Sequence, residues 1–124
     1  MDQDLQASMI EYYTHRASEF DKKYKGNRQL SILDPRTNEH EVKILSETVK
    51  ASCDGVLLDM ACGTAFWLPH YAGNCSHITL FDQSEEMLSH ARDRADSLGI
   101  INQTDLILGD ALSYQFSENR FDTV

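Results

Sequence analysis

The stretch VLLDMACGTA at residues 56–65 limits the possible folds of this chain more than any other. Three apolar residues run directly into an acid, Asp59, and a set of small residues follows. A short apolar run of this kind predicts a buried β-strand, and small residues let a ligand come close to the backbone of the turn after it. On this stretch alone, a tight strand-to-helix turn in another α/β protein fits equally well, because a turn with one glycine is a weak signal.

Two more apolar runs are also followed by acids. ITLF at residues 78–81 precedes Asp82, and LILG at residues 106–109 precedes Asp110. The first of them lies at the distance expected for the next strand of a β-α-β unit, where a carboxylate can accept hydrogen bonds from both hydroxyls of a ribose. The alternation of these runs with helical segments predicts an α/β fold with a parallel sheet.

Together with the closing FDTV, these stretches resemble the motifs of class I S-adenosylmethionine-dependent methyltransferases over about residues 55–124. The family's first motif is D-x-[GA]-x-G-x-[GA], which residues 59–65 match with glycine at only one of the three small positions. GDA at 109–111 resembles its adenine-contacting segment, and FDTV resembles the opening of its fourth motif, commonly F-D-x-V. A nicotinamide-binding Rossmann domain would explain the first two acids, but it makes no demand for the third or for FDTV.

The resemblance implies that S-adenosylmethionine is the cofactor. It also implies which residues bind this cofactor, from their positions in the motifs. The implied cofactor-binding residues are Tyr13, Arg16, Asp59, Ala61, Cys62, Gly63, Thr64, Asp82, Gln83, Met87, Asp110 and Ala111. The methyl group of a sulfonium is already activated, so the protein mainly holds donor and nucleophile in attack geometry. We therefore assign no catalytic acid or base.

The same resemblance implies which part of the cofactor each residue would contact. Asp59 would orient the methionine amino group, directly or through water, and the turn at 61–64 would lie against the methionine part, with its closest backbone approach at Gly63. Asp82 would take the ribose. Each acid could instead be a helix N-cap, since all three lie just past strands.

The adenine ring would have four neighbours. Gln83 and Met87 would border it, Asp110 would accept from its amino group, and Ala111 would offer a backbone N–H. Cys62 stands at a variable position of the motif and is interpreted as a space-filler, because the motif places no base to activate it.

The first 24 residues repeat apolar side chains at helical spacing. Their YYTHRASEFD segment resembles the Y-x-x-x-A-x-x-[YF]-D helix that covers the cofactor in many small-molecule methyltransferases, so that Tyr13 or Arg16 could touch the cofactor carboxylate. An amphipathic helix packed at the sheet edge is the equal alternative. We accordingly divide the chain into a helical lid or cap at 1–50 and the first half of a Rossmann-like cofactor domain at 51–124.

Three further helices follow from local signals. The second should begin after Pro35, with Asn38 as N-cap, and a third should run over 65–71 with a kink at Pro69. A fourth should start at Ser84 or Asp82, carry an apolar stripe at 87, 88, 91, 95 and 98, and end at a glycine.

The resemblance also implies a three-layer fold whose complete sheet has seven strands in the order 3-2-1-4-5-7-6. This sequence supplies strands 3, 2, 1 and the first residues of 4, so we expect a chain truncated at the fourth strand and inactive by itself. The exposed flank of the first strand would favour a homo-oligomer or a strand swap. The acceptor is expected to be a small molecule.

Two other classes of function stay open. One is a nucleotide- or NAD-binding Rossmann protein, and the other is a non-catalytic fragment that binds the cofactor or acts as a dimerisation module. A response to NAD, and none to the methyl donor, would favour the first.

Composition excludes some partners. A net charge of −9 and an isoelectric point near 4.8 argue against a nucleic-acid grip, which needs clustered Lys and Arg. The start MDQD does not resemble a secretory signal, and no apolar run is long enough to span a membrane. The three cysteines suggest free thiols in a reducing compartment, so we expect a cytoplasmic protein. The five histidines form no metal-ligand pattern, and no metal is expected.

Overall fold

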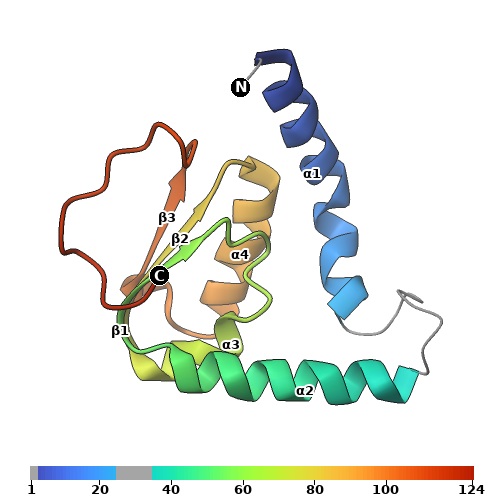
Figure 1. Cartoon of the computed structure of the whole chain (residues 1–124), viewed down its shortest axis with the longest axis vertical. Coiled ribbons are helices and arrows are strands. Elements are labelled where there is room, and N and C mark those ends of the chain that lie inside the picture. Colours follow the sequence, from blue (N-terminus) through green and yellow to red (C-terminus); the bar gives the residue numbers. More distant parts are fainter. Residues whose placement is uncertain (1–2, 25–34) are drawn as a thin grey trace.

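A computed structural model of this protein describes residues 3–24 and 35–124, with side chains described at 3–17 and 39–124. Its strands alternate with helices along the chain, as predicted (Figure 1). The elements are α1 (Gln3–Tyr24), α2 (Pro35–Ser52), β1 (Gly55–Met60), α3 (Leu68–Tyr71), η1 (Ala72–Asn74), β2 (Cys75–Asp82), α4 (Glu85–Ser97), η2 (Ile101–Gln103) and β3 (Thr104–Leu108).

The three strands form one parallel sheet in the order β1-β2-β3. The last residues of the chain lie on the other side of β1, where Thr123 forms a parallel bridge with Leu57 and its carbonyl accepts from the backbone N–H of Leu58 at 2.9 Å. The spatial order is therefore 3-2-1, with the start of a fourth strand beside the first. This confirms the predicted Rossmann-like α/β fold.

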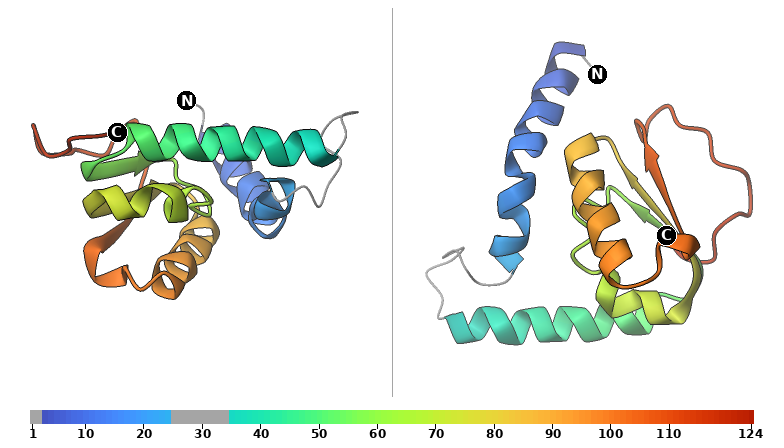
Figure 2. Two further views of the ribbon diagram at one scale, coloured as in Figure 1. Left: turned by 90° about the horizontal axis from the view of Figure 1, so that it is seen from below. Right: turned by 180° about the vertical axis from the view of Figure 1, so that it is seen from behind.

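Successive side chains of a strand point to opposite faces, and the two faces of this sheet are covered differently. On one face, Leu57, Ile78 and Leu80 form a buried cluster with residues of α3 and α4. Seen from behind, α4 lies in front of the strands and α1 lies beside α4 (Figure 2, right). On the other face, the ring of Phe81 packs against Tyr114 and Phe116 from the coil after β3.

Helix α2 begins earlier than predicted. It starts at Pro35, so Asn38 lies inside the helix and cannot be its N-cap. Proline is favoured at the first helical position, because its fixed φ suits the helix and the missing N–H has no helical partner there. The proline therefore determined the first residue of α2, and the capping-box pattern at Asn38 did not.

Helix α3 is shorter than predicted. It covers only Leu68–Tyr71, because Ala65 has a φ of 56° and cannot continue a right-handed helix. Pro69 therefore lies in the first turn of α3, where proline is tolerated, and does not kink an existing helix.

Helix α4 begins and ends close to the predicted residues. The hydroxyl of Ser84 accepts from the backbone N–H of Met87 at 3.2 Å, so Ser84 and not Asp82 is the N-cap. Gly99 follows the helix with a φ of +74°, the conformation expected of a C-terminal glycine. Leu98 differs from the prediction, since it is 41% exposed at the C-cap.

The cap of α4 gives a test of the fold. Replacing Ser84 with alanine removes a buried acceptor, and we expect a loss of about 1 kcal/mol in the free energy of unfolding. For a chain of this size that lowers the melting temperature by about 4 °C. Ser97→Ala, at the exposed end of the same helix, is the matched control and should change it little. Equal melting temperatures for Ser84→Ala and the unmodified chain would contradict the capping role.

Candidate functional site

A cavity of about 410 Å³ lies between α1 and the carboxyl ends of the three strands. In open α/β sheets this is the end at which ligands bind, and the volume is that of a small-molecule pocket. Eight of the residues predicted to bind the cofactor line it: Tyr13, Ala61, Gly63, Asp82, Gln83, Met87, Asp110 and Ala111. Four others do not line it: Arg16, Asp59, Cys62 and Thr64.

The turn after β1 has an unusual backbone. Ala61, Gly63 and Ala65 all have positive φ, at 58°, 59° and 56°. This left-handed region is strained for residues with a Cβ, and least so for small ones, which explains the alternating small residues of the motif. The backbone N–H of Cys62 donates to the carbonyl of Phe81 at 2.9 Å and so ties the turn to β2.

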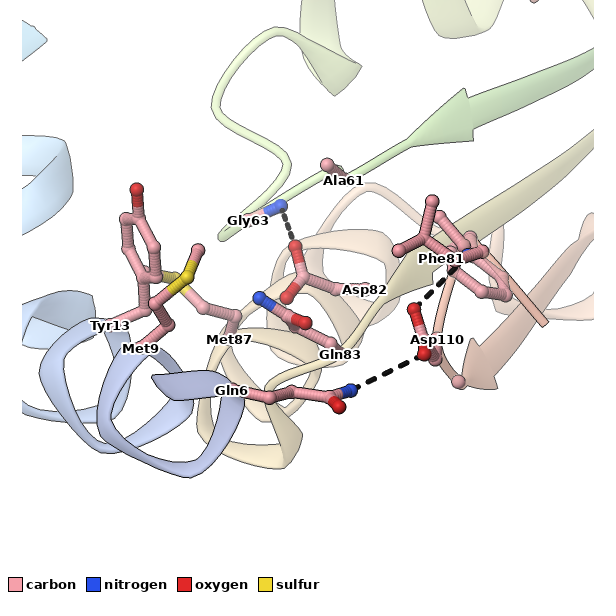
Figure 3. A pocket seen from close by; sticks show the side chains of 13 residues that line it. Gln6, Met9, Tyr13, Ala61, Gly63, Phe81, Asp82, Gln83, Met87 and Asp110 are labelled. Atoms are coloured by element: carbon pink, nitrogen blue, oxygen red, sulfur yellow. Dashed lines mark hydrogen bonds between the residues drawn. The ribbon is translucent and has the colours of Figure 1, made fainter. Parts of the chain in front are cut away.

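Asp82 connects this turn to α4. Its Oδ2 accepts from the backbone N–H of Gly63 at 2.8 Å, and its Oδ1 accepts from the backbone N–H of Ser84 at 2.9 Å (Figure 3 shows the first bond). The side chain is only 9% exposed. A carboxylate has about four acceptor positions, so about two remain for other donors.

Asp110 connects the loop after β3 to α1. Its Oδ1 accepts from the backbone N–H of Leu112 at 3.0 Å, and its Oδ2 accepts from Nε2 of Gln6 at 3.3 Å (Figure 3). Gln6 and Met9 also line this cavity and were not among the predicted site residues. The signal was available, because positions 6, 9 and 13 follow the i, i+3, i+7 spacing of one helix face.

An aromatic ring and a glycine that were not among the predicted residues form another part of the cavity wall. Phe81 and Gly109 both line the cavity, as does Leu112. A Cβ on Gly109 would lie 3.0 Å from Cζ of Phe81 and 3.2 Å from Cδ2 of Tyr114. Such contacts are too close without movement of a ring, so the glycine allows Phe81 to keep its place in the wall.

Helix α1 lies over the cavity, and its described side chains contact the rest of the domain near its middle and near its start. Near its middle, Ala17 is buried and the hydroxyl of Thr14 is 3.4 Å from that of Ser84. Nearer its start, Gln6 bonds to Asp110. Arg16 is directed elsewhere, because its Nη1 donates to the Tyr12 hydroxyl at 3.2 Å. Of the two α1 residues predicted to touch a cofactor, only Tyr13 faces the cavity.

Asp59 lies behind the turn. Its Oδ2 accepts from the Tyr71 hydroxyl at 2.6 Å. Burial raises the pKa of Asp59 above its ordinary value of 3.8, the Tyr71 hydrogen bond opposes this rise, and the nearby Asp82 adds to it. Burial, together with Asp59 and Asp82, also raises the pKa of the Cys62 thiol. A thiol that keeps its proton is a poor nucleophile, which supports the space-filling interpretation of Cys62.

The raised pKa of Asp59 predicts a dependence of stability on pH. Because the folded state binds this proton more tightly than the unfolded state, the stabilisation is fully present below pH 3.8 and is lost as the pH rises through the folded-state pKa. Asparagine removes the charge but can still accept from Tyr71. We expect Asp59→Asn to melt a few degrees higher than the unmodified chain at pH 7, with a smaller difference at pH 4.

Thermal unfolding between pH 4 and 8 measures this effect. Asp96→Asn, on the exposed surface of α4, is the control and should show no such trend. A lower melting temperature for Asp59→Asn at pH 7 would show that ionised Asp59 stabilises the fold.

Neither membrane spans nor metal clusters were found in the part of the chain that the structure describes. None of its helices is long and apolar enough to cross a membrane. Among the same residues, no group of three or more His, Cys, Asp or Glu side chains could hold a metal ion.

Solved structures resemble this fold over most of the chain. DhpI in its complex with SAH superposes with a TM-score of 0.68 at 22% identity, over 94% of this chain and 50% of that one. A SAM-dependent methyltransferase from Thiobacillus denitrificans, in complex with S-adenosyl-L-homocysteine, gives 0.52 at 26% identity, over 67% and 34%. The [4+2]-cyclase SpnF gives 0.58 at 30% identity, over 67% and 32%.

Sequence comparison gives relatives of known activity. The demethylmenaquinone methyltransferase of Staphylococcus epidermidis is 34% identical over 91 residues, which are 69% of this chain and 36% of that protein. Its counterpart in Bacillus licheniformis is 30% identical over 109 residues, 85% of this chain and 46% of that protein. The chain thus spans less than half the length of these relatives. A family model described as a methyltransferase domain matches residues 57–124, more than half of the chain, and the protein therefore belongs to the class I SAM-dependent methyltransferase family.

Proposed function

We propose that this chain binds S-adenosylmethionine in the cavity beneath α1 and is the cofactor-binding part of a methyltransferase for a small molecule. The observation that carries the proposal is the pair of carboxylates, Asp82 and Asp110, at the ends of neighbouring strands on one cavity. Both keep acceptor positions free after their internal hydrogen bonds are counted. The cofactor offers matching donors, namely two ribose hydroxyls and an adenine amino group.

Each group of residues would bind a different part of the cofactor, as the family motifs imply. Asp82 would accept from the ribose hydroxyls, while Asp110 and the Ala111 N–H would hold the adenine edge between Phe81 and Met87. The turn around Gly63 would lie against the methionine part. When bound, S-adenosylmethionine supplies an activated methyl group, so these residues need only fix its position and keep water away.

The turn after β1 favours this cofactor over NAD. A dinucleotide-binding domain holds the pyrophosphate at the N-terminus of the helix that follows its glycine-rich turn. Here α3 has four residues and starts only at Leu68. Two acids, Asp59 and Asp82, lie close enough to the turn to raise the pKa of the Cys62 thiol, and they would repel a pyrophosphate.

The acceptor and the methyl transfer are a further part of the proposal. Relatives named for methylation of demethylmenaquinone support a small-molecule acceptor, but a related fold also serves a [4+2]-cyclase. Because the chain spans less than half of those methyltransferases, we expect residues 1–124 alone to bind the cofactor without completing the transfer. In this division, residues 1–50 are the lid or cap and residues 51–124 hold the cofactor.

Calorimetry with S-adenosylhomocysteine and with NAD tests the proposal. We expect the 124-residue chain to bind S-adenosylhomocysteine and not NAD. Asp82→Asn should weaken that binding at least about tenfold, because it removes a charged acceptor. Asp96→Asn is the control and should bind as the unmodified chain does. Binding of NAD alone would favour the nucleotide-binding alternative, and binding of neither would contradict the proposal.

The role of α1 as a lid has its own test. The Gln6–Asp110 bond holds the start of α1 over the cavity, so Gln6→Ala should speed the release of S-adenosylhomocysteine by about two- to tenfold. Gln3→Ala, one turn away on an exposed position, is the matched control. Stopped-flow displacement measures both rates, and equal release from the two variants would show that Gln6 does not retain the ligand.

A further inference from the structure

Tyr71 is a buried tyrosine outside the family motifs that makes a specific contact with one of them. It is the last residue of α3 and only 3% exposed. Its hydroxyl lies 2.6 Å from Oδ2 of Asp59, the first acid of the motif. Burial, Asp59 and the hydrogen bond all raise the pKa of Tyr71, so its O–H stays protonated and donates. The contact therefore stabilises the ionised form of Asp59.

Asp59 has few other means of keeping its charge. Asp82, from β2, repels it and raises its pKa. Two thiols lie close enough to interact electrostatically with Asp59, namely Cys62 in the turn and Cys53 after α2. The pKa of each is raised, so neither thiol stabilises the charge of Asp59. The Tyr71 hydroxyl is the contribution that lowers the pKa of Asp59. It occupies Oδ2 and leaves Oδ1 as an acceptor.

We propose that Tyr71 is a positioning residue of the cofactor site, whose hydroxyl holds the Asp59 carboxylate charged and correctly oriented for the cofactor's ammonium group. This inference rests on the proposed function, in which Asp59 serves the methionine amino group directly or through water. Neither Tyr71 nor Asp59 lines the cavity. In this proposal the effect of Tyr71 on binding passes through Asp59, and Asp59 reaches the amino group through a bridging water.

If Tyr71 acts through Asp59, the affinity for the ligand should depend on pH in a specific way. Tyr71→Phe removes one oxygen and keeps the ring that packs in the core. Without the donor, the pKa of Asp59 rises further, and a larger fraction of Asp59 is neutral at a given pH. The variant should then bind S-adenosylhomocysteine about three- to tenfold more weakly, and its affinity should begin to fall at a higher pH than that of the unmodified chain as the pH is lowered.

A double-mutant cycle separates this role from packing. In an Asp59→Asn background, Tyr71→Phe should cause no further loss of affinity and no pH-dependent difference. Tyr114→Phe, which removes another tyrosine hydroxyl but on the opposite face of the sheet, is the matched control and should bind normally. The melting temperature of each unliganded variant shows that it is folded.

Three results would overturn the inference. An equal loss at all pH values, and in both backgrounds, would make Tyr71 a packing residue only. Normal binding by Tyr71→Phe would remove any positioning role. If the unmodified chain binds no S-adenosylhomocysteine, the proposed function itself fails. An NMR titration of the Asp59 carboxyl then still decides the electrostatic part, because Tyr71→Phe should raise that pKa and an unchanged pKa would overturn it.

Discussion

The Asp82 carboxylate is the interaction on which the site depends. One oxygen accepts from Gly63 and the other from Ser84, so a single side chain joins the turn after β1 to the start of α4. A buried carboxylate costs free energy unless it is hydrogen-bonded, and these two N–H groups meet that requirement. In return the turn keeps a backbone with three positive φ angles. The two bonds therefore fix the position of the turn relative to the start of α4.

The elements that local signals determine were predicted well. Apolar runs followed by acids predicted the three strands that the structure describes, and the cap expected at Ser84 or Asp82 predicted the start of α4. The start of α3 was missed, because nothing in the composition of residues 65–71 indicates that Ala65 is left-handed. The motif specifies small residues there, but the reason is the φ angle that they permit.

Contacts between distant segments were the part that the sequence could not give. Gln6 and Asp110 are separated by 104 positions, and only the fold of α1 over the sheet brings them together. The same holds for Phe81 and Tyr114, whose contact depends on how the coil after β3 returns to the sheet. For Asp59 and Tyr71 the separation is 12, but the contact needs the short α3, which was itself predicted wrongly.

The charges around the cavity favour uncharged or cationic hydrogen-bond donors over anions. Asp59, Asp82 and Asp110 are hydrogen-bond acceptors when ionised, and each already receives donors from this chain: a hydroxyl, backbone N–H groups, or a side-chain amide. Donors that carry no negative charge can use the acceptor positions that are left, whereas a phosphate would add repulsion. Asp82 and Asp110 line the cavity, whereas Asp59 does not, so in the proposed function hydroxyls and an amino group of the ligand would meet the first two acids. Such a site is selective by the sign of its charges before any shape is considered, and the net charge of −9 acts in the same direction at longer range.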